Sequence, residues 1–305
     1  MAEPQVQDAG SSAGMAPNRL DEQHIFTTQT LGFLIHPNIP ALPPNAKIAD
    51  IGTGTGIWLL DVAKTVPATC ELRGFDVSAS SFPARETWPA NVTFATHDMN
   101  APFAAAELGT YDVVAVRFVS GATPRAAWAR AVANLATLLR PAAGWLQWID
   151  SANFALYNSV PGASRAACQQ IYDGLRPFRP EPRSSAARTG DGDDDDAEAA
   201  VIGLMMREPG NLRRPDVWRA LGLVDVHEDV FSTDRLQDPG LRLRDRGTRN
   251  VIECFVGCLQ SLVGVEGSGW TRERIERLNA EAMREIDAGV YHTLDQICIV
   301  GRRAG

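Results

Sequence analysis

The stretch that decides the fold is KIADIGTGTG, residues 47–56, in which an apolar strand-like run ends in a glycine-rich loop. A helical pattern begins directly afterwards, near Ile57. Glycines let such a loop turn sharply and approach a bound nucleoside, while the next helix offers unpaired backbone N–H groups. No Gly-Lys-Ser/Thr follows, and the spacing is Gly-x-Gly-x-Gly rather than the Gly-x-Gly-x-x-Gly of dinucleotide sites. The stretch therefore predicts a nucleoside site, excludes a nucleoside triphosphate loop and weakens the case for a dinucleotide site.

Short apolar runs continue to alternate with helical segments up to about Asp150. The candidate strands are KIADI, CELRGF, NVTFAT, DVVAVRF and GWLQWI. Before the last of them, a helical stripe over residues 128–139 stops ahead of Pro141. Two later candidates, GLVDVHEDVF and YHTLDQICIVG, enclose further helical sequence. This alternation predicts an α/β fold with a mainly parallel seven-stranded sheet and a late helical insertion.

Four regions are expected along the chain. Residues 1–17 form a disordered tail, residues 18–46 an N-terminal helical lid, and residues 47–160 the cofactor-binding core. Residues 161–305 form a helical cap with the last two strands, and the acidic run at residues 189–199 is a solvated loop. The helices of the insertion suit a cover for a pocket or a homodimer surface equally well.

Composition limits the partners. Apolar residues make up 45% of the chain, as in ordinary globular proteins. Much of the net charge of -8 comes from the acidic run. The sequence shows no basic stripe interleaved with aromatic residues, so nucleic acid is not expected as a partner. The five cysteines are odd in number and scattered, which indicates a reducing, cytoplasmic location without disulfides. No apolar run is long enough for a membrane span. Cys254 and Cys258 have no matching Cys or His pair nearby, so no metal site is expected. Since no footprint for nucleic acid is present, the expected partner is a small molecule.

The glycine loop resembles motif I of the class I S-adenosylmethionine-dependent methyltransferases. More narrowly, IADIGTGTGIWLLDVA, GFDVSASSFP, YDVVAVRF and GWLQWID, with the leading RLDEQH, are similar to fungal natural-product methyltransferases related to the LaeA group. The resemblance covers residues 19–150 and thins in the C-terminal half. It implies a Rossmann-like fold, S-adenosylmethionine as the cofactor and a place in secondary metabolism.

The resemblance also assigns the cofactor contacts, strand end by strand end. Asp76, with Val77 beside it, occupies the place of the acid that binds the ribose hydroxyls. Asp98 matches the acid that accepts from the adenine amino group, with Met99 adjacent, and Arg117 lies under the methionine part. The remaining contacts come from Asp50, near the end of the first strand, and from four loop residues: Gly52, Thr53, Gly54 and Gly56.

Three residues are candidates for the chemistry. His24 shares a helical stripe with Leu20 and Leu31, so it faces the core either as a general base or as a hydrogen-bonded structural histidine. Asp150 ends the fifth strand, on the edge of the sheet where substrates bind. Trp148 is a candidate substrate contact, with a core tryptophan as the alternative.

These residues predict direct transfer of a methyl group to a small, partly apolar natural product. A hydroxyl is the favoured acceptor, with nitrogen, thiol and carboxyl groups left open. Positioning of the acceptor should supply much of the acceleration. Two alternatives remain: a cofactor-binding dehydratase or pericyclase that transfers no methyl group, and a LaeA-like regulatory protein that works through partners.

Overall fold

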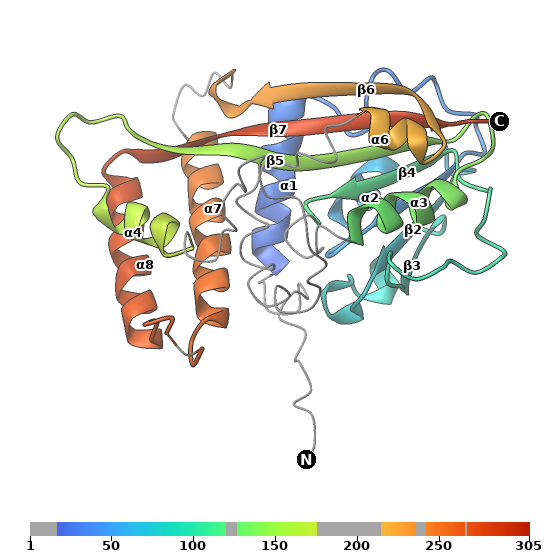
Figure 1. Ribbon diagram of the computed structural model, residues 1–305. Coiled ribbons are helices and arrows are strands. Elements are labelled where there is room, and N and C mark those ends of the chain that lie inside the picture. Colours follow the sequence, from blue (N-terminus) through green and yellow to red (C-terminus); the bar gives the residue numbers. More distant parts are fainter. Residues whose placement is uncertain (1–16, 120–126, 176–214, 236–241, 266) are drawn as a thin grey trace, which may run out of the picture.

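The computed structural model of this chain describes residues 17–119, 127–175, 215–235, 242–265 and 267–305. One seven-stranded sheet runs through the molecule in the order β3-β2-β1-β4-β5-β7-β6 (Figure 1). Its strands are β1 (Lys47–Ile51), β2 (Glu71–Asp76), β3 (Val92–Thr96), β4 (Val113–Arg117), β5 (Trp145–Asn158), β6 (Leu223–Ser232) and β7 (Val290–Arg303). The predicted tail, apart from Pro17, and the whole acidic run lie outside the described residues.

The sheet confirms the predicted α/β architecture. The first five strands pair in parallel, and β7 lies antiparallel to both β5 and β6. One difference concerns β5, which continues to Asn158 although the apolar run that predicted it ends near Ile149. Residues 150–158 stay extended because they pair with β7 across a bulge between Ala152 and Ala155, a long-range contact without a local sequence pattern.

Helices cover both faces of the sheet. The described helices are α1 (Pro17–Leu31), α2 (Ile57–Ala63), α3 (Trp128–Leu138), α4 (Ala166–Gly174), α6 (Pro215–Ala220), α7 (Arg242–Ser261) and α8 (Arg272–Asp287). On one face, Leu31 at the end of α1 and Trp58 of α2 join the apolar residues of β1. On the other, α3 and Trp218 of α6 pack on β4 and β7. The sheet is therefore buried on both sides, as mainly parallel sheets are.

Helix α1 differs from its predicted length. Residues recur at helical spacing from Leu20 to Leu34, a pattern that predicts a helix stopping before Pro37, but the helix ends at Leu31. Gly32 follows with φ +84°, and its N–H donates to the Thr28 carbonyl at 2.8 Å. A glycine in the left-handed conformation satisfies the last carbonyls of a helix and turns the chain. The segment after it lies over the sheet, with Phe33 packed against the core.

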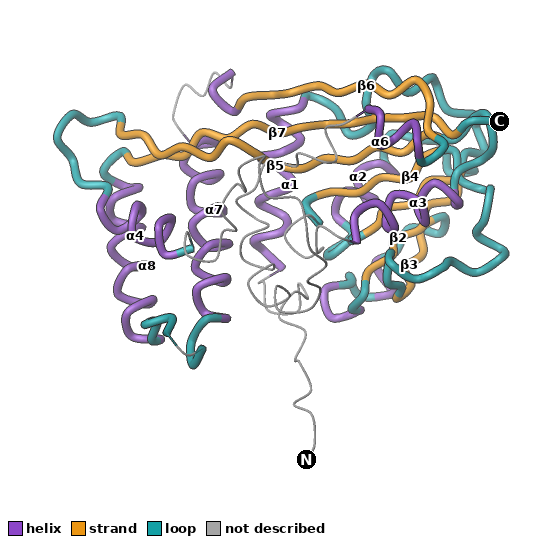
Figure 2. Tube along the Cα trace, viewed as in Figure 1, coloured by secondary structure: helices purple, strands orange, loops and turns teal. Residues whose placement is uncertain are grey.

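The predicted insertion consists of α7 and α8, which lie between β6 and β7 in the chain. Together with α4 they form a separate helical layer against the extended ends of β5 and β7 (Figure 2). The Thr271 hydroxyl accepts the Arg274 N–H at 3.2 Å, so Thr271 is the N-cap residue of α8. Trp270, Ile275 and Phe255 belong to the apolar cluster that joins the three helices. We restrict the name helical cap to this layer, α4 with α7 and α8.

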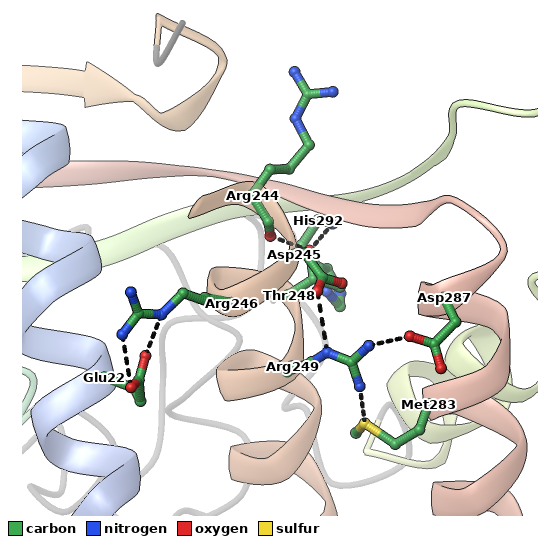
Figure 3. Close-up of polar contacts among 9 residues, drawn as sticks. All are labelled: Glu22, Arg244, Asp245, Arg246, Thr248, Arg249, Met283, Asp287 and His292. Carbon is green, nitrogen blue, oxygen red and sulfur yellow. Dashed lines mark hydrogen bonds and ion pairs between the residues drawn. The ribbon is translucent and has the colours of Figure 1, made fainter. Parts of the chain in front are cut away.

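Helix α1 is tied to the helical cap by polar contacts along α7. Glu22 accepts two hydrogen bonds from the Arg246 guanidinium, at 2.5 and 2.7 Å (Figure 3). The Asn250 amide donates to the Arg19 carbonyl at 2.6 Å. Between them, a Cβ on Gly247 would lie 2.4 Å from the Phe26 ring, so the two helices touch at a glycine. Helix α1 therefore connects the cap to the core.

Candidate active site

The candidate site lies where the strand order reverses. From β1 the chain proceeds outward through β2 and β3, and then returns to place β4 on the other side of β1. In open α/β sheets, ligands bind beyond the carboxyl ends of the strands at this switch point. The glycine loop follows β1, and Arg117 ends β4, the neighbouring strand. The two features that were predicted to bind one cofactor are thus adjacent at one edge of the sheet.

The three loop glycines adopt backbone conformations that side chains disfavour. Gly52, Gly54 and Gly56 have φ values of +68°, +56° and +72°. A Cβ on Gly52 would lie 2.6 Å from a Val119 methyl group, and one on Gly56 would lie 2.5 Å from the Phe94 ring. The loop conformation therefore requires glycine at these positions, because both backbone strain and contact would oppose a side chain.

Asp50 is the buried carboxylate of the site. One of its oxygens accepts the Thr53 hydroxyl at 2.7 Å, whereas Oδ1 is buried and has no hydrogen-bond partner within the described part of the chain. Burial raises the pKa of Asp50 to about 6, although the Arg117 charge and the Thr53 hydrogen bond oppose that rise. A buried carboxylate oxygen without a partner is costly, so this atom is poised to accept a hydrogen bond from a cation.

The two predicted outer acids lie at the ends of β2 and β3. Asp76 is buried and accepts the Gly54 N–H at 2.9 Å and the Ser78 N–H at 3.2 Å, which links it to the loop. Each carboxylate oxygen has two acceptor positions, so Asp76 retains capacity for a diol. Val77 beside it is 56% exposed. Asp98 is exposed and accepts the Asn100 N–H at 2.8 Å.

Met99 lies next to Asp98 but faces the other way. Its side chain is buried in the core, and its carbonyl accepts the Asn134 amide at 3.1 Å. The Met99 carbonyl therefore already has a protein partner. The loop, Asp76 and Asp98 follow one another along the edge formed by β1, β2 and β3.

A second polar chain crosses from α1 to β4. The Asp61 carboxylate lies 2.9 Å from His24 Nε2, and His24 Nδ1 lies 3.2 Å from Arg117 Nη1. His24 is 3% exposed, and both burial and the Arg117 charge lower its pKa, against the opposing effect of Asp61. Both ring nitrogens are therefore engaged. The imidazole does face inward, as its stripe predicted, and it contacts protein groups there.

The remaining two candidates lie on the α3 side of β5. Asp150 is buried and accepts its neighbour's Ser151 N–H at 3.0 Å. The Trp148 indole N–H is directed at the same carboxylate, at 3.4 Å. The indole ring is 1% exposed and packs against Trp128, with the ring centroids 6.1 Å apart. Trp148 is thus a core tryptophan, and its role as a substrate contact stays a prediction that this packing does not support.

Sequence reasoning missed the residues that seat α1 on the glycine loop. The Thr55 hydroxyl donates to Asp21 at 2.7 Å, and a Leu20 methyl group lies 3.1 Å from where a Cβ on Gly54 would be. Asp61, the partner of His24, was missed as well. The stripe that contains His24 and Leu20 signalled only that one face of α1 is buried, and nothing local indicated what that face contacts.

Comparison with known proteins identifies the family. The sequence profile described as "Methyltransferase domain" matches residues 48–142, which hold β1 to β4 and the glycine loop. The N-methyltransferase tcpN of Claviceps purpurea is 30% identical over 216 residues, covering 70% of this chain and 67% of that protein. This chain belongs to the S-adenosylmethionine-dependent methyltransferases. The family, the enzyme class and the cofactor are thereby confirmed.

Other relatives match a shorter part of this methyltransferase. The N-methyltransferase sirN of Leptosphaeria maculans is 37% identical over 132 residues, which cover 43% of this chain and 45% of that protein. The methyltransferase grgD of Penicillium sp is 38% identical over 154 residues, or 48% of this chain and 52% of that protein. The chain thus spans about half the length of these two relatives.

A solved structure shows the same fold at low sequence identity. The phosphoethanolamine N-methyltransferase 2 of Haemonchus contortus, in complex with S-adenosyl-L-methionine, superposes with a TM-score of 0.52 at 11% identity. The superposition covers 100% of this chain and 62% of that chain. It confirms the Rossmann-like methyltransferase fold.

The residues of this methyltransferase fit its cofactor. The orphaned Oδ1 of Asp50 suits the cofactor's ammonium group, and the glycine loop suits close approach of a nucleoside. Asp76 has the lone pairs that a ribose diol needs.

The described residues offer neither a metal site nor a membrane-spanning helix. No group of three or more His, Cys, Asp or Glu residues there could hold a metal ion. No described helix is long and apolar enough to cross a membrane.

Proposed function

We propose that this methyltransferase transfers the methyl group of S-adenosylmethionine to a nitrogen of a small natural product. The observation that supports the site is the adjacency of the glycine loop, Asp50 and Arg117 at the switch point of the sheet. A second observation is the helical cap, joined through α1 to the same edge, which suits the cover of a small-molecule pocket. A bound cofactor supplies an electrophilic sulfonium methyl group.

The protein's part in this chemistry is positioning and exclusion of water. Asp50 accepts from the cofactor's ammonium, Asp76 accepts from the ribose hydroxyls, and Asp98 accepts from the adenine amino group. Helix α1 lies on the loop through Leu20 and covers this edge. Holding an acceptor in line with the methyl group, away from water, supplies several kcal/mol of barrier lowering in displacement reactions, about 7–11 kcal/mol in well-oriented cases.

The surroundings of the two base candidates support nitrogen as the acceptor. A hydroxyl, which the sequence analysis favoured, needs a base to take its proton, whereas both ring nitrogens of His24 are engaged by protein groups and Asp150 is buried beside the Trp148 indole. A neutral nitrogen attacks through its lone pair and loses its proton afterwards, so it needs no base before the transfer. The names of tcpN and sirN, both N-methyltransferases, support nitrogen as well.

The proposal is tested by incubating the purified chain with S-adenosylmethionine that carries a trideuterated methyl group. Matched pairs of small cyclic amines and phenols serve as acceptors, and the products are analysed by mass spectrometry. The labelled methyl group is expected on nitrogen in the amine member of a pair. Label on the phenol alone would overturn the nitrogen assignment. A rearranged product of unchanged mass would support the pericyclase alternative, and an unlabelled product that has lost one water would support the dehydratase alternative.

A further inference from the structure

We propose that His24 is a positioning residue: it holds the Arg117 guanidinium for the carboxylate of the cofactor's methionyl group, and Asp61 fixes the imidazole in the form that this requires. The inference rests on the proposed function only in that the cofactor binds at this edge of the sheet. It gives His24 a role other than the general base expected from its place on α1.

The hydrogen-bond chemistry fixes the form of the imidazole. Arginine only donates, so His24 Nδ1, at 3.2 Å from Arg117 Nη1, accepts. The proton must then lie on Nε2, which donates to Asp61 Oδ2 at 2.9 Å. The ring is neutral in this arrangement, in agreement with a pKa that burial and the Arg117 charge lower. No lone pair of the ring remains for a substrate proton.

Among the described residues, Arg117 contacts His24 and Trp58. Its guanidinium lies over the Trp58 ring, 5.6 Å from the centroid, and Nε is buried without a hydrogen-bond partner among the described residues. The charges of Arg117 and Asp50 influence each other, yet the two side chains form no direct ion pair in the described structure. An α-amino acid carries an ammonium and a carboxylate, so its head group suits a position between a carboxylate and a guanidinium.

The origin of the three residues explains why α1 matters to the cofactor. His24 comes from α1, Asp61 from α2 and Arg117 from the end of β4. The imidazole therefore links α1, the helix that covers the site, to the Arg117 guanidinium. Without this hydrogen bond, an arginine with many rotamers must be ordered when the ligand binds, which costs about 0.5–1.5 kcal/mol or up to about tenfold in affinity.

The test compares two ligands by isothermal titration calorimetry. S-adenosylhomocysteine carries the methionyl-type head group, whereas 5′-methylthioadenosine has the same adenosine part without it. In His24→Phe, which keeps a ring but lacks both nitrogens, affinity for S-adenosylhomocysteine is expected to fall about tenfold. Affinity for 5′-methylthioadenosine is expected to stay within about twofold. Equal losses for both ligands would show that His24 only seats α1, and an unchanged affinity for S-adenosylhomocysteine would also overturn the proposal.

Variants of Asp61 provide an independent check that leaves the buried ring in place. Asp61→Asn keeps an oxygen that accepts from Nε2 and should retain most of the affinity, whereas Asp61→Leu should behave like His24→Phe. Lys64→Ala is the matched control, because Lys64 donates to Asp61 at 2.6 Å from an exposed position. It should leave both ligands' affinities unchanged, and equal affinities for the Asn and Leu variants would contradict the role of Asp61.

Coupling with Arg117 completes the test. If His24 acts through the guanidinium, adding His24→Phe to an Arg117→Ala variant should cost no further affinity for S-adenosylhomocysteine. Additive losses would refute action through Arg117. Failure of the cofactor assignment looks different, because the unmodified chain would then bind neither S-adenosylhomocysteine nor 5′-methylthioadenosine.

Discussion

The affinity of this methyltransferase for S-adenosylhomocysteine should fall as the pH is lowered from 7 to 5, because Asp50 becomes protonated. Burial raises the pKa of this carboxyl to about 6. Only the ionised form pairs with the ligand's ammonium group, which stays protonated throughout this range. The sign is therefore a loss of binding as the pH falls through 6, in contrast to an ordinary exposed aspartate, which remains ionised at pH 5.

The magnitude follows from the same pKa. A group that titrates at about 6 is ionised to about 90% at pH 7 and about 10% at pH 5, so the apparent Kd should rise about tenfold. The groups that act on Asp50 are Arg117, Thr53 and Asp76. The Arg117 guanidinium keeps its charge over the whole range. His24 also lies in contact with Arg117, so the profile is repeated in the His24→Phe variant to exclude a contribution from the imidazole.

The assay is calorimetric titration at half-unit pH steps, with 5′-methylthioadenosine as the control ligand because it lacks the ammonium group. Asp50→Asn keeps the shape of the side chain and removes its charge, so it should weaken S-adenosylhomocysteine binding about 10- to 100-fold at pH 7 and abolish the pH dependence. A flat profile for the unmodified chain, or an equal pH dependence for both ligands, would refute the reasoning.

Three further predictions concern the glycine loop, a turn and a buried histidine of β7. Gly54→Val should abolish S-adenosylhomocysteine binding, because φ is +56° and a Cβ would lie 3.1 Å from Leu20; titration showing unchanged affinity would place the ligand elsewhere. Ala142→Gly should raise the free energy of unfolding by about 0.5–1 kcal/mol, since Ala142 has φ +59° and the left-handed conformation strains alanine; a lower melting temperature would contradict this. His292, with neither ring nitrogen hydrogen-bonded within the described residues, has a pKa that burial lowers to about 3. Because the unfolded chain binds a proton at His292 and the folded chain does not, the free energy of unfolding falls as the pH drops below 6.5. In urea unfolding between pH 7 and 5, the unmodified chain should therefore lose about 2 kcal/mol more than His292→Leu. Equal losses would show that His292 does not titrate as inferred.

The parts of the fold that sequence predicted are those with a local signal. The glycine loop and the alternation of strands with helices both lie within short windows, and they predicted the mainly parallel seven-stranded sheet that the structure has. The extension of β5 to Asn158 has no such signal, because residues 151–158 are held in a strand by pairing with β7, more than a hundred residues later. The early end of α1 did have one, Gly32, but the prediction rested on the apolar stripe and did not use this glycine.

The candidate site divides in the same way. Asp50, Asp76 and Asp98 lie at or just beyond the carboxyl ends of β1, β2 and β3, so their place at one edge of a parallel sheet could be inferred from their strands. The inward orientation of His24 could be inferred as well, from helical periodicity. Its partners could not, because Asp61 is 37 residues away and Arg117 is 93 residues away in the chain. Helical periodicity places His24 on the buried stripe whether it is a general base or a positioning residue, and only its contacts distinguish the two roles.

The most direct test of the account is a crystal structure of the chain with S-adenosylhomocysteine. The account predicts the ligand at the switch point, with its ammonium on Asp50, its carboxylate on Arg117 and its ribose on Asp76, and with His24 still bonded to the guanidinium. A ligand whose head group lies away from Asp50 and Arg117, or a His24 ring turned from Arg117 toward an acceptor site, would contradict it.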